Sequence, residues 1–166
     1  MTMARITPLI LLVTLLLVSP AMAQEVLQNE ALNTQVTQPD GWNTATGSDR
    51  TTFTFRHPES QSQIEIIGTQ LITADVADIF FGTFHETVRG AEFLNPQESE
   101  RSYGSRTGTE TIYAFSHSGV ELRITVFQFV ENDIAWLVVS YIPVSDVESL
   151  GPVLGQVIDS IVTNTD

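Results

Sequence analysis

The sequence contains no cysteine and no lysine. All seven of its basic residues are arginines, against 20 aspartates and glutamates, and the formal net charge is −13. Without cysteine the protein has no disulfides, no thiolate metal ligands and no thiol nucleophile, so its stability must come from packing. A surface this acidic repels nucleic acid and anionic lipid, and we expect neither as a partner.

Several enzyme and cofactor motifs are also missing. The sequence has no G-x-S-x-G elbow of a serine hydrolase, no glycine-rich phosphate loop and no D-x-D-x-D-G calcium loop. We therefore assign no catalytic residue, no cofactor and no metal ligand, and we predict a protein that is not an enzyme.

The first 23 residues have the features of a signal peptide. Arg5 precedes an apolar run from Leu9 to Val18, and Ser19-Pro20 then leads to the small-x-small pattern of Ala21-Met22-Ala23. The run is too short to cross a bilayer of roughly 30 Å as a permanent anchor. We predict cleavage after Ala23, a periplasmic or secreted location and no stable membrane anchor.

The rest of the chain is expected to form one domain. Residues 24–37 are polar and predict a flexible N-terminal leader, whereas 38–163 contain no linker or repeat. This length suits a single domain with one core, and we expect a monomer.

Alternating apolar residues and turn residues predict an antiparallel sheet. Ile134–Ile142 is apolar on both faces, which indicates a central strand, and Gly68 marks a possible bulge. After the turn Pro39–Trp42, the predicted strands are Thr51–Arg56, Gln63–Leu71, Leu94–Tyr103, Glu110–Ser116, Val120–Val130 and Ile134–Ile142.

Two helices complete the predicted fold. The first follows Thr73 and ends at Arg89-Gly90, and the second opens with a capping box of Ser145 and Glu148. Gly151-Pro152 should kink or restart the second helix. The order β-β-β-α-β-β-β-β-α predicts an α+β fold, an antiparallel sheet of about six or seven strands flanked by two main helices.

This arrangement resembles the PsbP and DcrB-like superfamily, which also includes the Mog proteins. The resemblance covers Gln38 to Val162, nearly the whole predicted domain. It rests on four structural motifs, which are PDGW at 39–42, F-x-F-x-x-P at 53–58, G-x-E-x-x-Y at 108–113 and V-I-D-S-I at 157–161.

The resemblance implies a small exported bacterial member of the superfamily, with a sheet flanked by helices and an accessory or binding role. The partner it implies is an envelope or extracellular protein. The lysine-rich surface of the photosynthetic members is missing, so a photosynthetic role is not expected. Binding to Ran, the partner of the Mog proteins, is excluded by the predicted export.

The stretch Asp78–Gly90 carries His85-Glu86 and comes close to the H-E-x-x-H zinc motif. Arg89 occupies the position of the second histidine and cannot ligate zinc. A helical projection places Phe81 inward, His85 at the border of the polar face and Glu86 well outside. We therefore expect a solvated helix face and consider Phe81, His85 and Arg89 as one wall of a surface groove.

Other candidates remain open at this point. Trp42 follows a turn and either packs or contributes to a binding surface. The segment Ser102–Gly108, beside Arg101, is expected to be a loop and could receive an anion. Two further functions stay as alternatives, a secreted metal-assisted hydrolase that uses the isolated histidines and an envelope stress or salt-adaptation factor. The isolated histidines are His57, His85 and His117.

Overall fold

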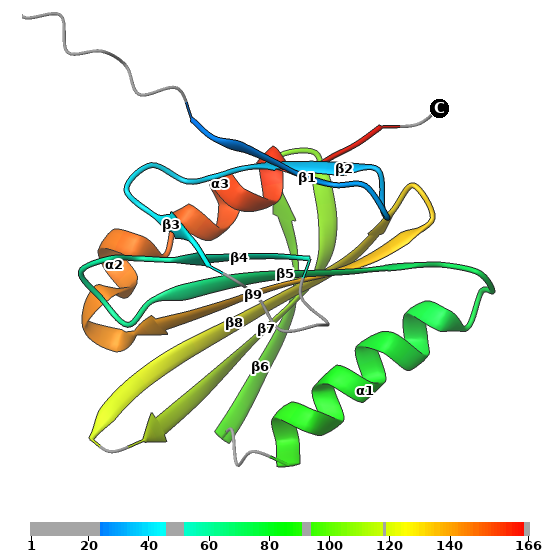
Figure 1. Ribbon diagram of the computed structural model, residues 1–166. Helices are drawn as coiled ribbons and strands as arrows, with labels where there is room; N and C mark the ends of the chain where they lie inside the picture. Colours follow the sequence, from blue (N-terminus) through cyan, green and yellow to red (C-terminus); the bar gives the residue numbers. More distant parts are fainter. Residues whose placement is uncertain (1–23, 46–51, 91–93, 118, 165–166) are drawn as a thin grey trace, which may run out of the picture.

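The computed structural model describes residues 24–45, 52–90, 94–117 and 119–164. Its main element is a seven-stranded antiparallel sheet in the order β3-β4-β5-β9-β8-β7-β6 (Figure 1). The strands are β3 (Asn43–Thr44), β4 (Phe53–Arg56), β5 (Gln63–Gln70), β6 (Leu94–Tyr103), β7 (Arg106–His117), β8 (Val120–Glu131) and β9 (Ile134–Pro143). With the helices packed on it, this sheet confirms the predicted α+β class.

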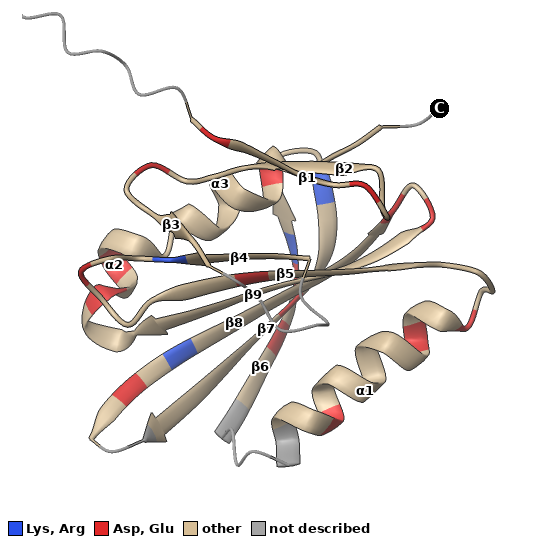
Figure 2. Cartoon of the chain, viewed as in Figure 1, with Lys and Arg blue, Asp and Glu red and all other residues tan. Residues whose placement is uncertain are grey.

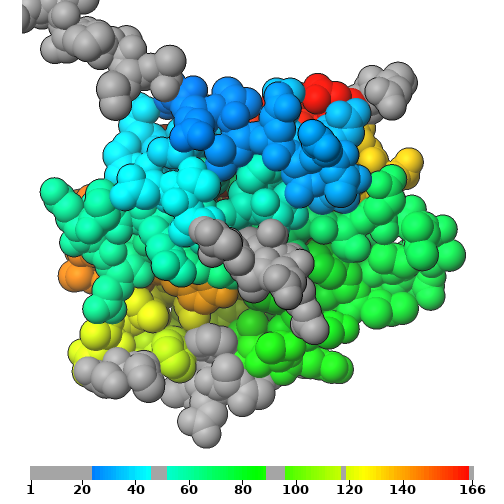
Figure 3. Space-filling model, in the orientation of Figure 1, coloured from blue at the N-terminus to red at the C-terminus, as the bar shows by residue number. Residues whose placement is uncertain are grey.

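A second, three-stranded sheet joins the two ends of the domain. It consists of β1 (Val26–Asn29), β2 (Thr34–Thr37) and β10 (Val162–Thr163), with β2 in the middle. The expectation of a flexible leader over 24–37 is therefore wrong. Val36 is fully buried in the core, and this burial fixes the segment in place. In Figure 3 the segment, in blue, lies against the rest of the molecule. The predicted signal peptide, 1–23, lies outside the described residues.

The helices lie on opposite faces of the large sheet. Helix α1 (Val76–Gly90) covers one face. The turn η1 (Val144–Asp146) leads into α2 (Val147–Leu150) and α3 (Val153–Ser160), and α3 covers the other face together with β1 and β2 (Figure 1). The predicted restart at Gly151-Pro152 is confirmed, because the helix divides there.

The predicted capping box is wrong. Ser145 lies inside η1, and the N-cap of α2 is Asp146, which makes no side-chain capping hydrogen bond. Ser145, the predicted N-cap, is part of the 3-10 turn, and its hydroxyl donates to the Asp146 side chain instead.

The sheet separates two hydrophobic clusters. Trp136 belongs to the cluster under α3, whereas Leu137, the next residue of β9, belongs to the cluster under α1. Such alternation is expected of a strand covered on both faces. Because β9 pairs with β5 on one side and β8 on the other, the prediction of a central strand at Ile134–Ile142 is confirmed.

Gly68 provides space for a neighbouring ring instead of forming a bulge. The β5–β9 register runs unbroken from Gln63 to Gln70. A Cβ atom on Gly68 would lie 2.6 Å from a ring carbon of Trp136 and 2.7 Å from a methyl carbon of Leu32. A glycine in the strand therefore permits the close approach of the indole.

Acidic side chains are spread over strands, turns and helices, whereas the few arginines lie mainly on the strands (Figure 2). Glu98 and Glu100 are exposed on β6, the strand at one edge of the large sheet, where charged side chains discourage pairing with another sheet. Within the described residues, no helix has the length and apolar character needed to cross a bilayer.

Candidate functional site

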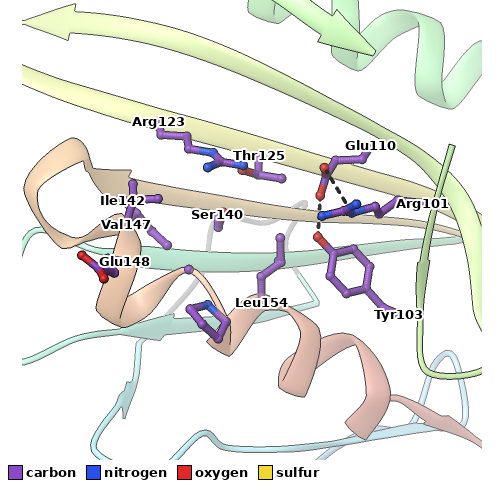
Figure 4. A pocket seen from close by; sticks show the side chains of 12 residues that line it. Arg101, Tyr103, Glu110, Arg123, Thr125, Ser140, Ile142, Val147, Glu148 and Leu154 are labelled. Atoms are coloured by element: carbon purple, nitrogen blue, oxygen red, sulfur yellow. Dashed lines mark hydrogen bonds and ion pairs between the residues drawn. The ribbon is translucent and has the colours of Figure 1, made fainter. Parts of the chain in front are cut away.

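A cavity of about 300 Å³ lies between the α2–α3 segment and the large sheet (Figure 4). Strands β6 to β9 form one wall, and Val147, Glu148 and Leu154 of the helical segment contribute to the other. The volume is at the lower end of the range of ligand pockets, roughly 300 to 1,000 Å³.

Strand register brings the polar residues of the cavity together. Thr125 of β8 lies directly opposite Ser140 of β9, and Arg123 lies opposite Ile142. Arg123 and Thr125 are two residues apart on one strand, so their side chains point to the same face of the sheet. Both hydroxyl-bearing residues are buried, with 5% of Thr125 and 2% of Ser140 exposed.

A buried carboxylate lies at one end of the cavity. Glu110 of β7 is 5% exposed, and it accepts a short hydrogen bond from the Tyr103 hydroxyl of β6. The Arg101 Nε atom lies 3.8 Å from the other carboxylate oxygen. Burial, and then the hydrogen bond to Glu110, raise the pKa of Tyr103 to about 12, so this phenol stays protonated and donates at neutral pH.

Arg123 differs from the other arginine of the cavity. Two ion pairs occur among the described residues, Arg101–Glu110 and Arg106–Glu131, and Arg123 takes part in neither. Its side chain is half-buried in the cavity wall (Figure 4). In the described part of this acidic chain, Arg123 is thus a cation without a carboxylate partner.

The His85 side chain points toward the sheet, on the face opposite to the cavity. Its Nδ1 lies 2.6 Å from the Tyr113 hydroxyl, and its Nε2 lies 2.8 Å from the Gln128 side-chain oxygen. The half-buried residue lies at the border of the polar face, as the projection places it. The expectation that its ring belongs to a solvated face is wrong, because these two polar groups hold the imidazole and offset the cost of burying it. Glu86 is exposed, as predicted.

The other groove candidates do not gather into one surface. Phe81 packs against the hydrophobic cluster under α1. Trp42 is only 2% exposed and belongs to the cluster on the other face, so of its two alternatives it packs in the core and does not contribute to a binding surface. The Arg89 backbone lies in α1, and its side chain falls outside the described part of the structure.

The described histidines lie on opposite faces of the sheet. The His57 ring packs edge-on against Trp42, with ring centroids 5.4 Å apart, in the cluster away from His85. The His117 side chain is outside the described residues. Within the parts of the chain that the structure describes, no three histidine, aspartate or glutamate side chains are grouped so as to hold a metal ion.

Sequence reasoning singled out Arg101 and the segment that contains Tyr103 but missed the other residues that build this cavity. The segment Ser102–Gly108 is part of two continuous strands joined by a tight turn at Gly104, where φ is +56°, and it is not a loop. The sequence of β8 contained one indication of the cavity. The polar residues Arg123 and Thr125 lie on the same face of the strand as the apolar Phe127. The pairing of Thr125 with Ser140 depends on register, which the sequence alone does not supply.

No protein-family model and no curated protein matches the sequence. The fold nevertheless matches solved structures. A protein from Bacteroides thetaiotaomicron is 13% identical with a TM-score of 0.65, and the match covers 87% of this chain but only 50% of that protein. This chain therefore spans about half the length of that relative.

Two further matches cover most of both chains. Cyanobacterial PsbP (CyanoP) from Synechocystis sp. PCC 6803 is 11% identical, with a TM-score of 0.54 over 88% of this chain and 96% of CyanoP. LpqN from Mycobacterium tuberculosis is 12% identical, with a TM-score of 0.54 over 84% and 89%. The chain has a PsbP-like α+β fold.

Proposed function

We propose that this protein is an exported, non-enzymatic accessory module that binds a protein of the cell envelope through the face carrying the cavity. The observation that carries the proposal is Arg123, a half-buried cation at a cavity in a chain of net charge −13. A cation held there without a carboxylate partner among the described residues is available to a ligand.

Two further points support an envelope role. The sequence predicts a signal peptide over residues 1–23. The structurally similar LpqN is described as involved in cell envelope biogenesis. With export, the natural ligands of the cavity are those of the periplasm or the exterior.

The chemistry of the cavity lining favours binding over catalysis. Its hydroxyl groups, on Thr125 and Ser140, have no histidine beside them in the lining. Activation of a serine or threonine hydroxyl normally needs such a base within hydrogen-bond reach. The buried Glu110 is already engaged by Tyr103 and Arg101.

The test is quantitative capture from an envelope fraction with three forms of the chain from Gln24 onward. These are the wild-type protein, Arg123→Glu and the matched control Arg56→Glu, which changes an exposed arginine on β4. Both variants have the same net charge. We expect one dominant partner with the wild-type protein and the control, and its loss with Arg123→Glu. Equal capture by both variants, or no partner at all, would refute the proposal.

A further inference from the structure

Arg123 stands where two hollows of the surface meet. On one side is the cavity of about 300 Å³ under α2 and α3. On the other is a more open hollow of about 470 Å³, lined by Gln97, Ile112, Ala114, Leu122, Val144 and also by Arg123. A ligand whose charged group pairs with Arg123 can therefore extend both into the enclosed cavity and along the open face of the sheet.

The polar groups around Arg123 suit a carboxylate. A guanidinium presents parallel N–H donors that match the two oxygens of a carboxylate. Thr125, on the same strand, and Ser140, across from it, add hydroxyl donors in the same lining. Glu110 does not compete for Arg123, because it already accepts from Tyr103 and pairs with Arg101.

The surroundings favour a ligand group with a single negative charge. Glu110 and Glu148 line the same cavity, and the whole chain carries a net charge of −13. A phosphate dianion or a run of acidic side chains would be repelled by these carboxylates. For a single carboxylate, the attraction to Arg123 exceeds the repulsion from Glu110 and Glu148.

Part of the cavity lining is apolar. Ile142, Val147 and Leu154 contribute this part from β9, α2 and α3. The volume of the cavity suits one large apolar side chain and not a long hydrocarbon chain. The open hollow on the other side of Arg123 then accommodates the rest of the ligand.

We propose that this cavity captures the C-terminal end of an extended peptide whose last residue is apolar. The terminal carboxylate pairs with Arg123, the last side chain enters the enclosed cavity, and the preceding residues run along the open hollow. Terminal carboxylate capture is a known mode of peptide recognition. The inference rests on the proposed function and names the chemical group by which the partner is bound.

The experiment is a titration of the chain from Gln24 onward with two model peptides, followed by two-dimensional NMR and calorimetry. Acetyl-Gly-Ser-Leu is added as the free acid and, separately, as the C-terminal amide, in which a neutral carboxamide replaces the carboxylate. We expect the acid to bind with shifts at Thr125 and Ser140, and the amide to bind at least about tenfold more weakly. Replacement of the last leucine by glycine should also weaken binding.

Variants locate the binding. Arg123→Gln should weaken binding of the acid at least about tenfold, whereas Arg56→Gln leaves it unchanged. Arg123→Lys keeps the charge but loses the planar fork, and an intermediate affinity is expected. The comparison of acid with amide uses the wild-type protein, so it tests the role of the terminal carboxylate even if an Arg123 variant folds poorly.

Three outcomes would overturn the inference. Equal affinity for acid and amide would show that the terminal carboxylate does not contribute to binding. Binding of hexanoate as tight as that of the peptide would assign the cavity to free organic acids. Failure of both peptides, with envelope capture still lost in Arg123→Glu, would reject carboxylate capture and leave the proposed function standing.

Discussion

The guanidinium of Arg106 lies 2.7 Å from the carboxylate of Glu131, and the same group donates to main-chain carbonyls at the end of α3. The accepting oxygens belong to Ile158, at 2.9 Å, and Ile161, at 2.6 Å. One side chain thus joins the start of β7, the end of β8 and the C-terminus of α3. The negative end of the helix dipole favours a cation at this position.

Replacement of Arg106 by alanine should therefore destabilise the fold. We expect Arg106→Ala to lower the free energy of unfolding by about 3 kcal/mol, because it leaves two carbonyls and a carboxylate without their donor. Urea denaturation followed by circular dichroism measures the change. In the control Arg101→Ala, the lost side chain is 62% exposed, and we expect less than about 1 kcal/mol. Similar losses in the two variants would contradict this account.

The hydrogen bonds of His85 give a second prediction. His85→Ala removes two hydrogen bonds, one to Tyr113 and one to Gln128, so the free energy of unfolding should fall by about 2 kcal/mol. Glu86→Ala changes the neighbouring exposed residue, and we expect a change within about 0.5 kcal/mol. Thermal and urea unfolding of both variants test the difference. A larger loss of stability in Glu86→Ala than in His85→Ala would place His85 outside the packed interface.

The raised pKa of Tyr103 predicts that the protein loses stability at high pH. Burial and Glu110 raise the pKa of its phenol from 10 to about 12, so between these values the unfolded chain loses a proton that the folded chain keeps. The contribution is complete below pH 10 and declines as the pH rises toward 12. The pKa of Tyr141 is also raised, by burial and by Glu65, and adds to the same decline.

Urea unfolding at several pH values from about 8 to about 12 measures this slope. The slope should be smaller in Tyr103→Phe, which has no phenol to ionise. In Glu110→Gln, ultraviolet titration should show the pKa of Tyr103 moving down toward 10, since the negative neighbour is gone. An unchanged slope in Tyr103→Phe would show that other groups cause the decline.

Two glycines should respond in opposite ways to alanine. Gly82 lies in α1, and a Cβ atom added there would meet no heavy atom within 4 Å, so Gly82→Ala should stabilise by about 0.5–1 kcal/mol. At Gly108 the Cβ would collide with the main-chain oxygen of Gln128 and touch the Phe127 ring. Gly108→Ala should cost about 1–3 kcal/mol. Chemical denaturation of both variants provides the comparison.

Strong local patterns allowed much of the fold to be predicted. The doubly apolar stretch Ile134–Ile142 identified the central strand, because only a strand covered on both faces has this composition. Gly151-Pro152 located the break between α2 and α3, since proline removes a donor and glycine weakens the helix.

The parts that could not be predicted depend on distant pairing. The strands β1 and β2 are short and polar, and they become ordered because β10 pairs with β2 and Val36 enters the core. The inward direction of the His85 ring depends on Gln128, which is 43 residues away in the sequence. The cavity likewise needs the register of β8 with β9 before Thr125 and Ser140 come together.

The pairing of β2 with β10 has a consequence for the order of folding. Strand β2 pairs with the nearby β1 on one side but finds its second partner only in Val162–Thr163, and the Asn33 side chain also donates to the Asn164 carbonyl. Until Val162–Thr163 have been synthesised, β2 has one open strand edge. The arrival of these residues, rather than the formation of the large sheet, therefore sets the moment at which β2 is protected from pairing with another chain.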